Sequence, residues 1–339
     1  MSGGTDSSMA AIYLQEQGFD VHGITFLMFL DEIGEQPAFI SEAKSLAVKL
    51  GIHHYICDVR DAFHQTVIAH FVDEYKNGRT PNPCIYCNEN FKWKLLAEKA
   101  YELGIVKIAT GHYAQIVNYN GQKCIAKGED VAKDQSYFLY RLPQQILERA
   151  VFPLGKLTKK AIKDDAEQRG LLKLASKKES MGICFLKNQG IASLLSKYIP
   201  TPELGDVVDV HGTVLGSHSG YYKFTVGQKK GLEGIIPLDC CVTAINSESN
   251  KLIVGATEKL MVSTVLLTDC IIHDQHGLGK NILNIRVRGI DSVPFHLGSV
   301  TIRDNNSLLI KFEQPVWNIT PGQSVVIYDD NRILAGGIA

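Results

Sequence analysis

Apolar and polar residues follow two different periods along the chain, and the change between them divides it. Up to about residue 175, segments with apolar residues every three or four positions alternate with short apolar runs, which indicates helices alternating with buried strands. Glycines after several of these segments mark helix ends. The expected helices lie over 9–17, 39–50, 61–77, 88–102 and 159–169, and the expected strands over 21–27, 53–59 and 106–113.

This alternation is typical of an α/β fold with a doubly wound parallel sheet, which binds ligands at the carboxyl ends of its strands. An Asn-Gly pair at 120–121 predicts a hairpin. From about residue 187, short β-type runs separated by Gly, Pro, Asn and Asp predominate. We therefore expect a Rossmann-like α/β domain followed by two smaller, mainly β domains. The expected boundaries are 1–186 for the α/β domain, 187–248 for a small central β-rich domain and 249–339 for a C-terminal β-barrel.

Composition narrows the class of protein. The 339 residues are 45% hydrophobic and 21% charged, as in a globular protein of more than one domain. The net charge of -1 excludes binding to nucleic acid through overall positive charge, although a local basic surface remains compatible with it. No apolar stretch or leader predicts a membrane partner, so we expect a cytoplasmic protein. Eight cysteines in that compartment do not indicate a disulfide framework, and some should have a chemical role.

The amino-terminal segment, residues 2–8, reads SGGTDSS directly before an apolar-periodic run. Two glycines let the backbone approach a ligand, and the positive end of a helix dipole favours phosphate. The hydroxyls of Ser7 and Ser8 can add bonds, and Asp6 is a candidate for orienting Mg²⁺ or a catalytic group. A serine-capped helix behind a flexible terminus is the alternative.

The segment RTPNPCIYCN carries Cys84 and Cys87 three positions apart. A helix expected from Asn88 would direct its amino terminus at Cys87 and lower the pKa of its thiol, which makes Cys87 a candidate nucleophile. A zinc half-site, a redox pair and a pair of iron-sulfur ligands are the alternatives; no second ligand pair with zinc spacing follows.

Further polar clusters are candidates for ligand contact, each with an ordinary loop or strand face as its alternative. Arg286 and Arg288, two apart on an expected strand, would point the same way and could hold an RNA backbone. Cys184 stands alone in KKESMGICFLKNQG, at the junction between the α/β and β parts. The others are ATGHY at 109–113, KDQSYFLY at 133–140 and the basic turn VGQKKGL at 226–232.

Taken together, these motifs resemble one family. SGGxDSS, RTPNPxxxCN, ATGHY, KDQSYFL, GICF, GQKKGL and TPGQS occur in this order between residues 2 and 324, as in the tRNA-specific 2-thiouridylase (MnmA) family. SGGxDS alone would admit any ATP pyrophosphatase with this type of phosphate loop. The resemblance implies an enzyme that adenylates the C2 oxygen of the wobble uridine of tRNA and replaces it with sulfur from a cysteine persulfide, with tRNA and a persulfide donor protein as partners.

The resemblance also implies roles for individual residues. Cys184 corresponds to the persulfide-bearing cysteine and Cys87 to the nucleophile that assists sulfur release, with a Cys87–Cys184 disulfide as the product. The residues implied to bind ATP, with Mg²⁺, are Ser2, Gly3, Gly4, Asp6, Ser7, Ser8, Phe26 and Gly111. Those implied to contact tRNA are Asn82, Pro83, Cys84, Lys133, Asp134, Gln135, Arg286 and Val287.

The chain departs from the family pattern at three places. The family usually has a short strand ahead of the phosphate loop, whereas here the sequence starts at the loop; Cys84 stands where members often carry Asp; and Val287 replaces a frequent aromatic residue. The second change allows Cys84, Cys87 and Cys184 to be considered as ligands of a [4Fe-4S] cluster. Two other hypotheses therefore stand beside the persulfide enzyme: a cluster-dependent tRNA sulfur transferase, and a non-catalytic tRNA-binding paralogue.

Overall fold

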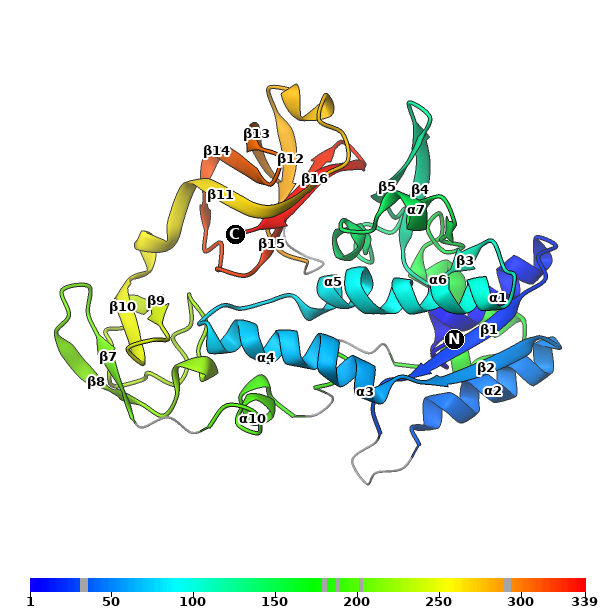
Figure 1. Ribbon diagram of the computed structural model, residues 1–339, viewed down its shortest axis with the longest axis horizontal. Helices are drawn as coiled ribbons and strands as arrows, with labels where there is room; N and C mark the ends of the chain where they lie inside the picture. Colours follow the sequence, from blue (N-terminus) through cyan, green and yellow to red (C-terminus); the bar gives the residue numbers. More distant parts are fainter. Residues whose placement is uncertain (31–35, 179–181, 187–188, 201–203, 290–293) are drawn as a thin grey trace.

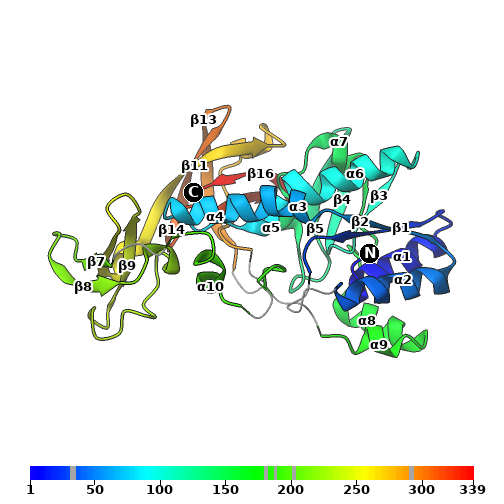
Figure 2. The same ribbon diagram turned by 60° about the horizontal axis from the view of Figure 1, so that its bottom comes forward.

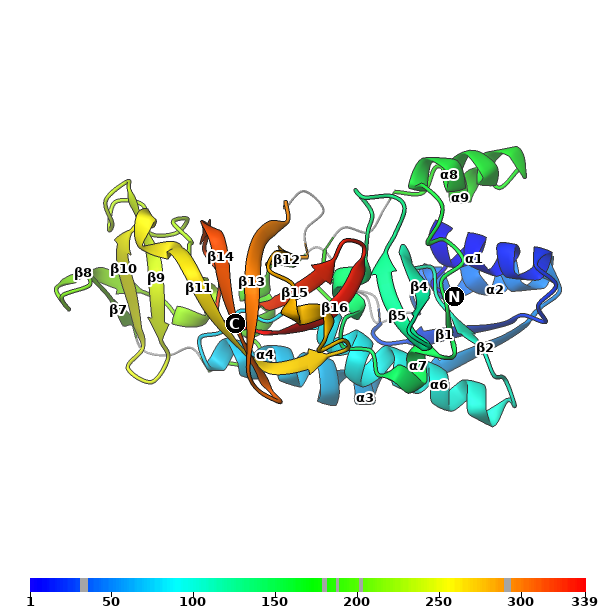
Figure 3. The same ribbon diagram turned by 90° about the horizontal axis from the view of Figure 1, so that it is seen from above.

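Three regions follow one another along the molecule in a computed structural model (Figure 1). The structure describes residues 1–30, 36–178, 182–186, 189–200, 204–289 and 294–339. An α/β region holds the amino terminus, a small sheet lies at the opposite end, and a β-barrel lies between them, as the view from above shows (Figure 3). The expected order of an α/β domain and two β domains is confirmed.

The α/β region contains two pairs of parallel strands. Strand β1 pairs with β2 in register from His22 and His53 to Leu27 and Asp58, and β3 pairs with β6. The strands are β1 (His22–Leu27), β2 (His53–Asp58), β3 (Ile108–Ala109) and β6 (Ala150–Val151). The main helices are α1 (Thr5–Glu16), α2 (Ala38–Leu50), α8 (Lys159–Gln168) and α9 (Leu172–Ala175). Helices α8 and α9 pack against α1 (Figure 2).

The ends of these helices follow the sequence signals. Gly18 and Gly51 have φ of 85° and 66° and terminate α1 and α2, because glycine adopts the left-handed conformation without steric cost. Thr158 caps α8 by accepting a hydrogen bond from the Ala161 amide at 3.2 Å. The strand expected over 106–113 is only two residues long, because its remaining residues form a loop over the amino-terminal turn.

Two long helical segments lie side by side beneath the barrel (Figure 1). Each contains a π-helical section. The first comprises α3 (Arg60–Phe63), η1 (His64–Ile68) and α4 (Ala69–Lys76), and the second comprises α5 (Pro83–Cys87), η2 (Asn88–Lys92) and α6 (Trp93–Glu102).

The second segment begins earlier than expected, so the helix start at Asn88 is wrong. Asn82 is the N-cap: its side-chain oxygen accepts hydrogen bonds from the amides of Cys84 at 3.2 Å and Ile85 at 3.4 Å. Pro83 occupies the first helical position, where its missing N–H costs nothing. Asn82-Pro83 is therefore a start signal that the sequence contains, and it places Cys84, not Cys87, in the first turn.

The expected Asn-Gly hairpin is present, with β4 (Ala114–Tyr119) and β5 (Gln122–Lys127) joined by Asn120 and Gly121, both at positive φ. Its second strand bridges to the C-terminal sheet, where Ala126 pairs with Arg332. The polar segment that follows it leads to the short helices η3 (Ser136–Leu139) and α7 (Gln144–Leu147).

The central sheet has the strand order β8-β7-β10-β9. Its strands are β7 (Gly205–Val208), β8 (Val214–His218), β9 (Cys240–Asn246) and β10 (Lys251–Ala256), and the helices beside it are α10 (Ile191–Leu195) and η4 (Tyr221–Lys223). The boundary expected at residue 248 falls in the turn between β9 and β10, so we propose that this domain runs to Ala256. The boundary expected after residue 186 adjoins 187–188, which lie outside the described residues.

The C-terminal strands follow the order β11-β14-β13-β12-β15-β16, and pairing of β11 with β16 closes the barrel. They are β11 (Met261–Ile272), β12 (Leu283–Arg286), β13 (His296–Asp304), β14 (Ser307–Trp317), β15 (Ser324–Asp329) and β16 (Arg332–Ile338), with η5 (Thr257–Leu260) and η6 (Gly277–Gly279) as short helices. Tyr137 and Tyr140 of the α/β region share one buried cluster with Val326 and Tyr328 of the barrel. Burial of this apolar surface holds the two regions together.

In the part of the chain that the structure describes, no helix combines the length and the apolar character needed to cross a bilayer.

Candidate active site

The amino-terminal turn is held in one conformation before any ligand binds. Ser7 Oγ accepts a hydrogen bond from the Ser2 amide at 3.0 Å and donates one to the Gly4 carbonyl at 3.2 Å. Gly3 has φ of 65°, and a Cβ there would lie 2.6 Å from the Phe39 carbonyl oxygen. The turn leads directly into α1, whose first amides have no partner within the helix. It therefore offers the donors that a phosphate group requires.

Gly111 packs directly on this turn. A Cβ at position 111 would lie 2.7 Å from the Asp6 carbonyl carbon and 2.9 Å from the Ser7 amide nitrogen, so only glycine allows the approach. The structure thus brings together two motifs more than 100 residues apart, SGGTDSS and ATGHY. Phe26, expected near an adenine, lies half-buried on β1 beside Cys57 of β2.

Asp6 is held by Tyr113, the last residue of the ATGHY cluster, and by Lys159, which no motif in the sequence indicated. Its Oδ1 accepts hydrogen bonds from the Tyr113 hydroxyl at 2.7 Å and from Lys159 Nζ at 2.6 Å. Lys159 is buried, and its amide donates to Asp130. Both bonds go to Oδ1, and among the described residues none donates a hydrogen bond to Oδ2. The position of Lys159 directly after a helix cap gave no sign of this contact, which depends on the packing of α8 against α1.

The segment ahead of the turn lies against β1. The Met1 carbonyl accepts a hydrogen bond from Thr25 Oγ1 at 2.6 Å, and the Met1 amino group donates to the Ile24 carbonyl. The turn is thus held by main-chain and side-chain contacts to β1 where the family pattern places a preceding strand.

Cys84, Cys87 and Cys184 come together at one place. Cys84 and Cys87 lie one turn apart on α5, and Cys87 packs in the same apolar cluster as Ile183 and Phe185, the two neighbours of Cys184. The charges of Cys84 and Cys87 both act on the titration of Cys184, which agrees with this proximity. All three thiols are free, and Cys184 is the exposed one.

The local environment keeps these thiols protonated. Although Cys184 is exposed, desolvation of its thiol and then the charges of Cys84 and Cys87 raise its pKa to about 12. Burial also raises the pKa of Cys84 and of Cys87. The expected lowering of the Cys87 pKa by a helix terminus is therefore wrong, because Cys87 ends α5 and the helix continues beyond it.

The charge of Lys92, at the end of η2, acts on groups beside the turn and on the three thiols. This positive charge acts in each case as a secondary effect that favours the deprotonated form. The groups whose pKa values it lowers are the Met1 amino group, Cys84, Cys87, His112 and Cys184. Burial is the larger cause for His112, whose pKa is held well below its usual value. The sequence did not indicate a role for Lys92, because it follows the RTPNPCIYCN segment and belongs to no recognised motif.

Among the described residues, no group of three or more His, Cys, Asp or Glu side chains is arranged to hold a single metal ion.

The residues implied to contact tRNA separate into two groups. Asn82 and Pro83 form the helix start beside the thiols, and Gln135 exchanges main-chain and side-chain hydrogen bonds with Tyr113. Lys133 precedes Gln135 by two positions in the same loop. The other three are interior: Asp134, Arg286 and Val287 are 2–3% exposed. Asp134 and Arg286 form an ion pair of 2.9 Å, so this structure gives them a role between domains and does not present them to RNA.

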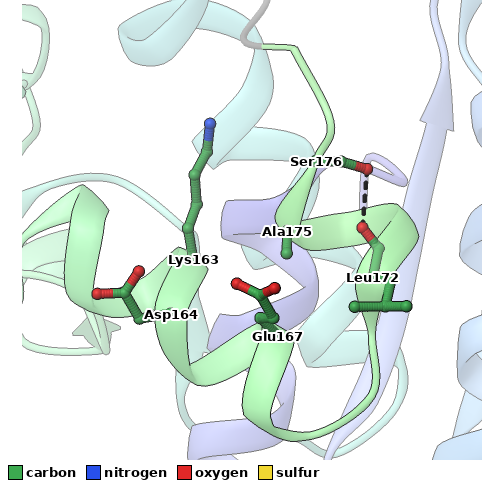
Figure 4. Close-up of a pocket in the computed structure, with 6 residues that line it drawn as sticks. All are labelled: Lys163, Asp164, Glu167, Leu172, Ala175 and Ser176. Atoms are coloured by element: carbon green, nitrogen blue, oxygen red, sulfur yellow. Dashed lines mark hydrogen bonds between the residues drawn. The ribbon is translucent and has the colours of Figure 1, made fainter.

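The surface of the described residues includes a groove and a smaller hollow. A groove of about 560 Å³ runs along η1 and α4; it is lined by His64, His70, Tyr86 and Tyr198 among others, and Tyr86 stands between Cys84 and Cys87 on α5. A smaller one of about 270 Å³ lies between α8 and α9, where the carboxylates of Asp164 and Glu167 line it (Figure 4). Lys163 lines the same hollow, so its lining carries both negative and positive charge.

The fold and this site define an α/β domain of the type that binds nucleotides, with a glycine-rich turn at the start of α1 and a group of three cysteines, followed by two β domains. The family model described as "tRNA methyl transferase HUP domain" matches residues 1–188. The model described as "tRNA methyl transferase PRC-barrel domain" matches residues 192–256, and that described as "Aminomethyltransferase beta-barrel domain" matches 271–339.

Curated relatives match almost the whole chain. "tRNA-specific 2-thiouridylase MnmA 3" of Phocaeicola vulgatus is 39% identical over 347 residues, which cover 99% of this chain and 92% of the relative. "tRNA-specific 2-thiouridylase MnmA" of Syntrophotalea carbinolica is 39% identical over 344 residues, covering 99% and 96%. The protein of the same name from Cytophaga hutchinsonii is 37% identical over 353 residues, covering 99% and 95%. The chain belongs to the tRNA-specific 2-thiouridylase MnmA family.

Proposed function

We propose that this chain is an ATP-dependent tRNA-uridine 2-sulfurtransferase that makes 2-thiouridine at the wobble position. The observation that carries this proposal is the packing of Cys87 with the two neighbours of Cys184. The charge of Lys92, which acts on these thiols and also on the Met1 amino group and on His112 next to Gly111, supports a common location for nucleotide and thiol chemistry.

The first half-reaction uses the turn. The C2 oxygen of the uridine attacks the α-phosphorus of ATP and pyrophosphate leaves, which converts a poor leaving group into an adenylate. We assign ATP binding to Ser2, Gly3, Gly4, Asp6, Ser7, Ser8, Phe26 and Gly111. Asp6 Oδ2 and the phosphates would hold Mg²⁺, which neutralises charge on the phosphates when bound. Lys159 and Tyr113 orient the Asp6 carboxylate.

The second half-reaction uses the thiols. A donor protein leaves a persulfide on exposed Cys184; the Cys87 thiolate attacks Cys184 Sγ, the persulfide S–S bond breaks, and hydrosulfide leaves with the electron pair. Hydrosulfide adds to C2 of the uridine, and AMP departs with the original oxygen. The Cys87–Cys184 disulfide then requires a thiol reductant.

The uridine must leave the anticodon stack to reach this place. We assign its contacts to Asn82, Pro83 and Cys84, with Lys133 and Gln135 in the neighbouring loop. The groove lined by His70 and Tyr86 offers aromatic surfaces for adjacent bases, because base stacking on aromatic side chains does not depend on sequence.

A thiolation assay with unmodified tRNA, ATP and a persulfide donor tests the proposal. We expect sulfur incorporation with the unaltered chain, none with Cys184→Ser or Asp6→Ala, and full activity with Cys240→Ser, a half-buried cysteine of the central sheet. Retention of full turnover by Cys184→Ser contradicts the persulfide role. Binding of tRNA without ATP-dependent release of AMP identifies the non-catalytic paralogue, and activity only after anaerobic reconstitution with iron and sulfide identifies the cluster enzyme.

A further inference from the structure

Lys92 is a partly buried cation without an acidic partner. Among the residues that the structure describes, its ammonium group forms no hydrogen bond and no ion pair. A long cationic side chain that is shielded from water and unpaired carries a desolvation cost, which an anion at the same place would offset. An anion next to the Lys92 ammonium group would therefore be stabilised by its charge.

The backbone of the helix directs Lys92 toward the thiols. In an α-helix, residues five positions apart lie about 140° apart around the axis, so positions 87 and 92 would face different sides. Residues 88–92 instead form a π-helical segment with i→i+5 hydrogen bonds, which turns less per residue than an α-helix. Residue 92 therefore lies nearer to the side of the helix that carries residue 87 than an α-helix would place it. A hydrogen bond from the main chain of Lys92 also favours the thiolate of Cys87.

The groups around Lys92 are the ones that sulfur transfer needs. The charge of Lys92 lowers the pKa of the thiols of Cys84, Cys87 and Cys184, of the His112 imidazole and of the Met1 amino group. Among them, only the thiols become anionic. Burial disfavours each thiolate, so a reaction that proceeds through them requires a compensating charge.

We propose that Lys92 activates the sulfur-transferring thiols by stabilising the thiolate of Cys87 and the hydrosulfide that leaves Cys184. This inference rests on the proposed function and adds a positioning residue to it. Cys87 releases its proton to solvent; its sulfur then bonds to Cys184 Sγ, and the electron pair of the broken persulfide bond departs on hydrosulfide. The negative charge moves from the Cys87 sulfur to the hydrosulfide and stays close to Lys92, so the ammonium group stabilises it throughout the step.

The test measures the thiols directly, without tRNA or ATP. Alkylation by iodoacetamide between pH 7.5 and 10, with Cys87 and Cys184 quantified separately by peptide mass, reports the thiolate fraction of each. Lys92→Met should slow alkylation of Cys87 about tenfold at a given pH, which corresponds to one unit of pKa, while Lys92→Arg keeps the rate near that of the unaltered chain. Lys94→Met, which removes an exposed lysine two residues further along the helix, is the matched control and should have no effect.

Equal alkylation of Cys87 in Lys92→Met and in the unaltered chain overturns the proposal, and so does equal slowing by Lys92→Met and Lys94→Met. Thermal unfolding of each variant identifies any loss of fold, and the Arg variant keeps the test decisive if the Met variant unfolds. A single-turnover arm with persulfide-loaded Cys184 should show the same order of rates. If the unaltered chain does not thiolate tRNA, the proposed function fails, whereas the alkylation result still decides the role of Lys92.

Discussion

Asp134 and Arg286 form an ion pair of 2.9 Å in the interior, although 152 residues separate them in the sequence. Asp134 also accepts hydrogen bonds from the amides of Gly128 and Ser136 and from the Ser136 hydroxyl. The carboxylate is thus saturated with donors, and the arginine from β12 supplies the charge that burial demands. This contact joins the loop after the β4–β5 hairpin to the barrel.

Breaking this pair should destabilise the protein strongly. Asp134→Ala leaves the Arg286 guanidinium buried without an anion, so we expect a loss of about 3–5 kcal/mol in the free energy of unfolding, measured by denaturant titration. The double variant Asp134→Ala with Arg286→Met should lose less than the sum of the single variants. Arg60→Ala, which removes an exposed pair with Asp58, is the control and should leave the midpoint nearly unchanged. Additive losses in the double variant would show that the two side chains act independently.

Gly111→Ala should weaken nucleotide binding without unfolding the domain. The new methyl group would lie 2.7 Å from the Asp6 carbonyl carbon, so the phosphate turn must move. We expect ATP affinity, measured by calorimetry, to fall at least about tenfold, which is about 1.4 kcal/mol. Gly279→Ala, where a Cβ meets nothing within 4 Å, should bind as the unaltered chain does. Normal ATP binding by Gly111→Ala would separate the 109–113 loop from the nucleotide site.

Lys159→Met should impair adenylation more than Tyr113→Phe. Both remove a hydrogen bond to Asp6 Oδ1, but the lysine bond joins two opposite charges, whereas the tyrosine hydroxyl is uncharged. Release of pyrophosphate in the presence of tRNA measures this half-reaction without involving the thiols. Lys160→Met, an exposed neighbour on the same helix, serves as the control. Equal rates in the variants at 159 and 160 would remove Lys159 from the site.

Alkylation of Cys184 should continue to rise well above pH 9. Its folded-state pKa is raised to about 12, so the folded chain holds the thiol proton more tightly than the unfolded chain does. The contribution of Cys184 to the free energy of unfolding is therefore constant below about pH 9, and it is lost as the pH rises from about 9 toward 12. The matched control is the same thiol in guanidinium chloride, where the alkylation rate should level off near pH 9. Levelling at the same pH in the folded protein would contradict the crowded environment of the three thiols.

Local features of this protein follow from the sequence because their physical causes are local. Gly51 ends α2, Asn120-Gly121 turns the β4–β5 hairpin and Thr158 caps α8, since each depends on the backbone preference or short-range hydrogen bonding of a few adjacent residues. The start of the helix that carries Cys84 and Cys87 was predicted wrongly, because the sequence contains two competing cap signals, Asn82-Pro83 and Asn88. The helix begins at the first of them.

Only the tertiary structure determined the contacts between segments that are distant in the sequence. These are Gly111 against Asp6, Lys159 on the Asp6 carboxylate, Asp134 with Arg286, and Cys184 beside Cys87. The motifs themselves could be read in order along the chain, and they indicated the family and the candidate residues. Whether a given Asp or Arg faces solvent or a buried partner depends on burial, which arises when elements far apart in the chain pack together, and no local pattern of residues encodes that.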